Sequence, residues 1–126
     1  MSLTVNITHW IVRITGVLQL ILGLLIWAEH MANLVNIHIL IGVIFVLSLW
    51  LLAATAATQG VPIGMALGAA LLGLLTFLLG FGQRDLLPDP SVHWIVQLVH
   101  LLLGMLAVGS GEMIGGRVRR ARLATA

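Results

Sequence analysis

His38 and His100 form the clearest chemical pattern in the sequence. Each is an ionisable residue inside a long apolar stretch, and each is followed four residues later by a glycine, Gly42 or Gly104. Ionisable side chains are costly inside a membrane and usually serve a function there. A glycine one helical turn beyond a histidine lies on the same helix face and leaves room beside the backbone. The pattern therefore predicts two matching ligand positions, one in each half of the chain.

The two histidine motifs belong to a longer repeat. Positions 38 and 100 begin a shared pattern, H-x-L-x-G-x5-S, when the second apolar segment is aligned with the fourth. The first and third segments align in the same way, with residues 16–23 ("GVLQLILG") on residues 73–80 ("GLLTFLLG"). We therefore expect two tandem helical hairpins, related by a pseudo-two-fold axis along the membrane normal. His38 and His100 would then face each other across the middle of a bundle.

Four apolar segments must position these histidines. The chain has 126 residues, of which 60% are hydrophobic and 8% are charged, whereas a soluble protein carries about 25% charged residues. A membrane-spanning helix needs roughly 20 apolar residues, so we predict spans at about residues 9–28, 33–57, 61–81 and 91–113. The connections between them are short, which favours antiparallel neighbours. The expected fold is all-α: a single transmembrane four-helix bundle.

The arginines indicate how the bundle is oriented. Four of the six lie in residues 114–126, and there is no lysine. The positive-inside rule then places both termini in the cytoplasm, with residues 114–126 as a basic cytoplasmic tail. We expect an integral membrane protein, of a bacterial inner membrane, whose tail contacts anionic lipids of the bilayer. We expect no nucleic-acid partner, and the absence of cysteine excludes disulfides and thiolate metal sites.

One layer near the outer face gathers the candidate site residues. A rise of about 1.5 Å per residue places His38 and Gly23 at similar depth, with His100 and Gly80 at compatible levels. Haem iron accepts imidazole nitrogen on both faces, and glycines on the neighbouring helices would leave clearance for a flat macrocycle. We expect a haem, with His38 and His100 as the iron ligands. The full set of predicted cofactor-binding residues is His38, His100, Gly23, Gly42, Gly80, Gly104 and His93.

The chain resembles the four-helix, bis-histidine membrane cytochromes b, such as the cytochrome b561-type proteins. The resemblance rests on the paired motifs at positions 38/42 and 100/104 and on the glycines of the first and third segments. It implies haem b held between diagonal helices, and electron transfer between a quinone or small reductant and a second membrane or periplasmic partner. Those proteins generally carry two histidine pairs, but here His9 is the only histidine near the inner side. We therefore expect one haem, near the outer face.

Several polar residues would surround this haem. His93 lies seven residues before His100 on the same helix face, where it would contact a propionate or sit among lipid headgroups. Arg84 would pair with a propionate or remain solvated beside Asp85 and Asp89. Gln19 and Thr76 are candidates to orient the imidazoles. We predict no catalytic residues and lean against an enzyme, because a haem with both axial positions filled by protein is suited to electron transfer.

Other functions remain open at this stage. The two histidines could form a structural pair joined by a hydrogen bond, or bind another tetrapyrrole such as a chlorophyll. A small four-helix transporter would need an intramembrane acid, and we expect Glu29 and Glu112 to lie near helix ends, with Arg13 about one turn inside the first helix. A third alternative is a non-haem accessory or anchor subunit of a larger membrane complex. Small-residue spacings such as Gly64/Gly68 would also suit a homo-oligomer.

Overall fold

Four long helices account for most of the chain in the computed structural model, which describes residues 3–126. The elements are α1 (Leu3–Glu29), the short 3₁₀ helix η1 (Ala32–Leu34), α2 (Val35–Ala57), α3 (Ile63–Gly82) and α4 (His93–Thr125). No strand occurs among these residues. Each of the four α-helices is long and apolar enough to cross a membrane. The prediction of an all-α, four-helix architecture is confirmed.

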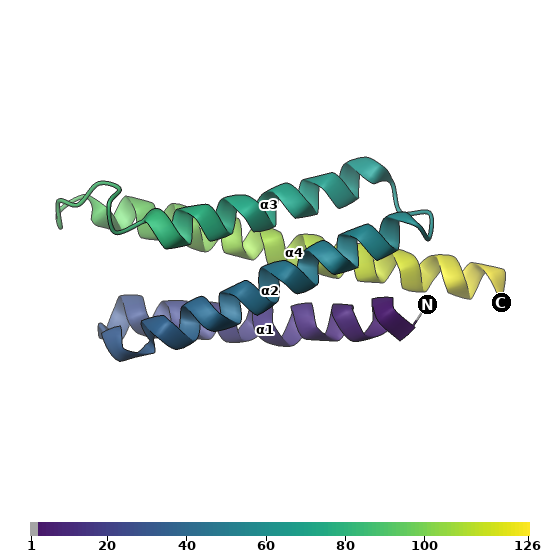
Figure 1. Ribbon diagram of the computed structural model, residues 1–126, viewed down its shortest axis with the longest axis horizontal. Coiled ribbons are helices and arrows are strands. Elements are labelled where there is room, and N and C mark those ends of the chain that lie inside the picture. The colour runs from purple at the N-terminus through teal and green to yellow at the C-terminus, as the bar shows by residue number, and fades with distance from the viewer. Residues whose placement is uncertain (1–2) are drawn as a thin grey trace.

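The helices form a closed ring of antiparallel neighbours. α1 packs on α2, α2 on α3, α3 on α4, and α4 on α1, and α2 also contacts α4 across the middle. α1 and α3 do not touch within residues 3–126. Both chain ends and the α2–α3 loop lie at one end of the bundle, called here the terminal end (Figure 1). The α1–α2 and α3–α4 connections lie at the opposite end, called here the loop end (Figure 1).

Two helices are longer than the apolar segments predict. α1 begins at Leu3 rather than near position 9, and α4 continues to Thr125 rather than ending near position 113. Residues 114–125, predicted as a tail, are therefore helical. The reason is packing: Val5 and Ile114 are fully buried and Val118 nearly so, so these turns still contribute to the bundle. Arginine also has a high helix propensity, and the charges at the end of α4 do not interrupt it.

The α2–α3 loop is a tight helix-terminating turn. Gly60 has φ +84°, a left-handed conformation that glycine adopts without a steric penalty. The backbone N–H of Val61 donates to the carbonyl of Ala56, and the N–H of Gly60 donates to that of Ala57. These two bonds form a Schellman motif. The turn fixes the direction in which Pro62 starts α3.

The packed core occupies the terminal half of the bundle. Leu49, Leu52, Ile114, Val5 and Val12 are its largest fully buried side chains. They come from the first half of α1 and the second halves of α2 and α4. Many leucine and isoleucine side chains elsewhere on the four helices are exposed on the outside of the bundle, as expected where lipid replaces water. The loop half of the bundle has few buried side chains, and it contains a cavity.

Candidate functional site

A cavity of about 420 Å³ lies in the loop half, between all four helices. Small-molecule and cofactor sites usually measure about 300–1,000 Å³. All seven residues predicted from the sequence to contact a cofactor line it: His38, His100, Gly23, Gly42, Gly80, Gly104 and His93. The structure therefore brings the predicted set together in one place.

His38 on α2 and His100 on α4 face each other in this cavity. Their ring centroids are 6.3 Å apart, with an angle of 72° between the ring planes. The Nδ1 atoms of both rings are buried and have no hydrogen-bond partner. No hydrogen bond joins the two rings within residues 3–126. An unsatisfied buried polar atom costs about 1–3 kcal/mol, so these two nitrogens are the notable polar atoms of the cavity.

Gln19 reaches the backbone that carries His38. The side-chain Nε2 of Gln19 donates to the carbonyl oxygen of His38 at 2.6 Å. On the other side of the cavity, the hydroxyl of Thr76 donates to the Leu72 carbonyl at 2.7 Å, within α3. Gln19 thus ties His38 to α1, whereas the hydroxyl of Thr76 is used by its own helix.

The glycines of the cavity leave room mainly for polar side chains. A Cβ at Gly80 would lie 2.6 Å from Cε1 of His100, and one at Gly42 would lie 2.7 Å from Nε2 of Gln19. A Cβ at Gly23 would reach ordinary contact with the His38 ring, at 3.4 Å. At Gly104 the nearest such atom is 3.9 Å away. Gly80 and Gly42 therefore give clearance to the imidazole and the amide, and Gly104 faces a more open part of the cavity.

The loop end of the cavity is polar. Four polar side chains line it there, from just after α3 to the first two turns of α4: Gln83, Arg84, His93 and Gln97. His93 donates through Nδ1 toward the carbonyls of Leu86 and Leu87, at 3.3 and 3.2 Å. His93 therefore ties the α3–α4 connection to the start of α4, which sequence reasoning did not predict.

Arg84 is exposed at this polar end. Within residues 3–126 it makes no ion pair with Asp85 or Asp89, the two acidic residues of the same loop. The carboxylate of Asp89 instead accepts hydrogen bonds from the backbone N–H and hydroxyl of Ser91, at 2.9 and 2.8 Å. These bonds hold the pKa of Asp89 below its ordinary value. Arg84 is therefore a guanidinium at the cavity mouth whose charge is not neutralised by the loop acids.

A second polar cluster joins α1 to α4 in the terminal half, outside this cavity. Arg13 donates from Nε and Nη2 to the two carboxylate oxygens of Glu112, at 2.9 and 2.6 Å. His9 Nε2 lies 3.4 Å from the same carboxylate, and the Arg13 guanidinium lies 4.9 Å from the Trp10 ring centre. Arg13 and Glu112 lie in the interiors of α1 and α4, because α1 begins earlier and α4 ends later than the predicted spans. The sequence did contain a signal for this pair, because Arg13 and Glu112 carry opposite charges within long apolar segments.

The ligand groups present do not form a site for a bare metal ion. No group of three or more His, Cys, Asp or Glu side chains is gathered for this purpose anywhere in residues 3–126. Protein sites for zinc use three or four such ligands. A haem iron needs only one or two axial ligands from the protein, because the porphyrin supplies the others. His38 and His100 are thus two potential ligands, fewer than a bare zinc ion needs.

Comparisons of the chain with protein-family models, with curated proteins and with solved structures found no match. The functional argument therefore depends on the geometry of the cavity.

Proposed function

We propose that this chain is a membrane b-type cytochrome, which binds one haem b between α2 and α4 and transfers electrons. His38 and His100 are the proposed iron ligands. The observation that supports this most directly is the pair of facing imidazoles in the wall of one cavity, each with a buried, unpaired nitrogen. Both residues come from matching sequence motifs. A shared ligand explains this match better than a chance meeting of two buried histidines does.

The spacing of the two rings agrees with a shared metal ion. His38 and His100 would hold the haem iron, which accepts imidazole nitrogen as a ligand. The observed separation is 6.3 Å. A direct edge-to-face contact between rings also allows such a distance, but it would leave both Nδ1 atoms unsatisfied. A bound cofactor accounts for the spacing and for the surrounding cavity together.

The polarity of the cavity also suits haem b, which has an apolar macrocycle with two propionates at one edge. The deeper walls are aliphatic and aromatic, including Phe45, Phe77 and Leu101. The loop end supplies Arg84 and Gln97, which can donate to carboxylates. No aspartate or glutamate lines this cavity. Arg84 and Gln97 would therefore bind the propionates at the mouth, and no carboxylate of the walls would repel them.

When bound, the haem supplies one-electron chemistry, and the protein residues supply its environment. Gln19 fixes the backbone that carries His38, Gly80 leaves space for the His100 ring, and the apolar walls limit access of water. In the proposed orientation, with both termini in the cytoplasm of a bacterium, the cavity opens toward the periplasmic side. The electron partners would be a quinone or a membrane or periplasmic redox protein that docks there.

The direct test is the reduced-minus-oxidised visible spectrum of the protein, expressed with haem available and purified in detergent. We expect a sharp low-spin haem b band in the parent protein and its loss in both His38→Ala and His100→Ala. His9→Ala is the matched control, because His9 is a half-buried histidine in the same bundle but outside the cavity. It should keep the band. A colourless parent protein would overturn the proposal.

A His93→Ala variant tests the choice of ligands. Its Nδ1 already interacts with loop carbonyls, so we expect the low-spin band to remain with a modest shift. If the band instead survives in His38→Ala and is lost in His93→Ala, the cofactor assignment holds and the ligand pair is wrong.

A small four-helix transporter is the second candidate, and one observation favours it. Glu112 lies in the interior of α4, as proton-coupled transport of a cation would require. However, its carboxylate is engaged by Arg13, and the large cavity contains no acid to bind a cation. Transport therefore ranks below electron transfer. A role as an accessory subunit of a larger complex, or as a homo-oligomer, is compatible with either function.

A further inference from the structure

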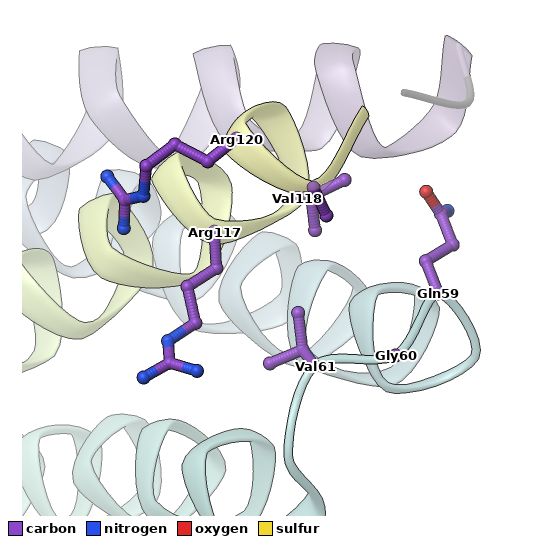
Figure 2. A pocket seen from close by; sticks show the side chains of 7 residues that line it. Gln59, Gly60, Val61, Arg117, Val118 and Arg120 are labelled. Carbon is purple, nitrogen blue, oxygen red and sulfur yellow. The ribbon is translucent and has the colours of Figure 1, made fainter. Parts of the chain in front are cut away.

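A second cavity, of about 300 Å³, lies at the terminal end of the bundle, between the α2–α3 loop and the last turns of α4. Figure 2 shows this site from close by. Its lining residues are Gln59, Gly60, Val61, Arg117, Val118, Arg120 and Ala121. It is separate from the histidine cavity and shares no residue with it.

Two arginines, Arg117 and Arg120, line this cavity and make its surroundings positively charged. Arg117 and Arg120 are three residues apart and therefore lie on one face of α4. In Figure 2, Arg117 extends from α4 toward α3, and Arg120 bends back along α4, with its guanidinium beside Gly116. No acidic residue lines the cavity. Within residues 3–126 neither arginine forms an ion pair, and Glu112, the one acid on α4, is bound by Arg13 and His9.

Helix dipoles do not change this charge much. α2 ends at Ala57 and α3 begins at Ile63, so a negative and a positive helix end meet beside the cavity. Their partial charges oppose each other. The two guanidiniums are therefore the main source of the field, and they attract an anion.

Apart from Gln59, the other lining residues are apolar, which favours an anion that carries an apolar group. Val61 and Val118 are 6% and 4% exposed and form the walls next to the arginines. The site also lies where α2 ends and α3 begins, while α4 continues past them. This level is the boundary of the apolar parts of the bundle. Arginine binds phosphate oxygens in a fork-like geometry. A phosphate attached to an apolar body, at the surface of a bilayer, matches these features.

We infer that this cavity binds the phosphate headgroup of an anionic phospholipid, from the leaflet in which the chain termini lie. The guanidiniums of Arg117 and Arg120 contact the phosphate oxygens, and the acyl chains leave along the apolar sides of α3 and α4. This site is independent of the proposed haem function, since no residue is shared.

The test is a lipid titration of the full chain in an uncharged detergent, with bound lipid counted by native mass spectrometry. Phosphatidylglycerol should bind at one saturable site, and phosphatidylcholine should bind at least about tenfold more weakly, because each favourable charge near the site contributes roughly 1 kcal/mol, or about fivefold. The variant Arg117→Gln/Arg120→Gln should bind phosphatidylglycerol about 25-fold more weakly than the parent.

A matched control separates a defined site from general attraction to a basic helix. The variant Arg119→Gln/Arg122→Gln removes the same charge from the same end of α4, at positions that do not line the cavity. It should weaken binding by less than about threefold. Equal losses in the two double variants would overturn the inference. Circular dichroism of each variant excludes loss of the fold as the cause.

The same titration distinguishes a lipid from free phosphate. Inorganic phosphate alone should neither raise the thermal stability of the lipid-free protein nor displace phosphatidylglycerol at equal concentration. If phosphate alone stabilises the protein as much as phosphatidylglycerol does, the lipid assignment is wrong. The haem spectrum of the parent and of both double variants should be identical, so failure of this inference leaves the electron-transfer proposal intact.

Discussion

The terminal half and the loop half of this bundle use the same kinds of residue in different ways. In the terminal half, Leu49, Leu52 and Ile114 are fully buried and fill the space between the helices. In the loop half, the same four helices enclose a cavity lined by histidine, glutamine and glycine. One half of each helix therefore stabilises the bundle, and the other half is available to a ligand.

Individual glycines serve both uses. In the terminal half, a Cβ at Gly111 would lie 2.6 Å from Cγ1 of Val12, so this glycine allows aliphatic packing, while Gly115 faces the imidazole of His9. In the loop half, the corresponding contacts at Gly80 and Gly42 are with an imidazole and an amide. Glycine thus permits close helix packing at some positions and the placement of polar side chains at others.

The largest expected contrast comes from leucine truncation in the two halves. Leu49→Ala removes a fully buried side chain and should lower the free energy of unfolding by about 2–5 kcal/mol. Leu101→Ala removes a side chain that already borders the cavity, and its effect should stay below about 1.5 kcal/mol. Unfolding by SDS, followed by circular dichroism in mixed micelles, measures both. Equal losses would mean that the loop half is packed as tightly as the terminal half.

Alanine at two glycines of α4 should give the next largest difference. Gly111→Ala forces Val12 to move, and such overpacking costs about 1–3 kcal/mol. Gly104→Ala adds a methyl group whose nearest neighbour is Thr76 Cγ2 at 3.9 Å, so it should change stability by less than about 0.5 kcal/mol. The same unfolding assay applies. A Gly104→Ala variant as unstable as Gly111→Ala would contradict the open cavity.

Gly80→Ala should act on the site more than on the fold. The new Cβ would lie 2.6 Å from Cε1 of His100, so the imidazole must rotate away from its position opposite His38. We expect haem retention to fall about tenfold or more, which corresponds to about 1.4 kcal/mol. Absorbance of the haem band per mole of protein, after dialysis against apomyoglobin, measures this. Gly109→Ala is the control, because Gly109 lies outside the cavity and a Cβ there meets no atom within 4 Å; equal retention in the two variants would show that Gly80 does not position His100.

The smallest effect is expected in the α3–α4 connection, outside both halves. Hydrogen bonds from Ser91 lower the pKa of Asp89, so the folded state favours the ionised carboxylate. The resulting stability is present above the ordinary pKa of the group and is lost as the pH falls through the lowered value. Asp89→Ala should therefore lower the thermal midpoint slightly at pH 7 and not at pH 2.5. A loss of equal size at pH 7 and at pH 2.5 would contradict this role for Asp89.

The sequence was sufficient to predict four helices and the meeting of His38 with His100. Segment length and hydropathy determine the first, and the matching histidine motifs on alternate helices indicate the second. The tandem-hairpin repeat itself stays a prediction, although Gly23 lies beside His38 as Gly80 lies beside His100.

Other features depend on tertiary packing and could not be predicted. The ends of α1 and α4 follow from burial of Val5 and Val118, which a count of apolar residues does not detect. The clearance at Gly42 is taken by Gln19 rather than by a cofactor edge, because side-chain direction decides which neighbour fills a gap.

The contact of Arg13 with Glu112 has a consequence for how the protein enters a membrane. The two residues are 99 positions apart, and at about 5–20 residues per second Arg13 is made roughly 5–20 s before its partner. An arginine at the centre of a membrane helix costs about 2.5–3.5 kcal/mol on insertion scales. In a membrane, α1 would carry this charge without its partner until α4 is inserted. Pairing of Arg13 with Glu112 would therefore accompany closure of the helix ring.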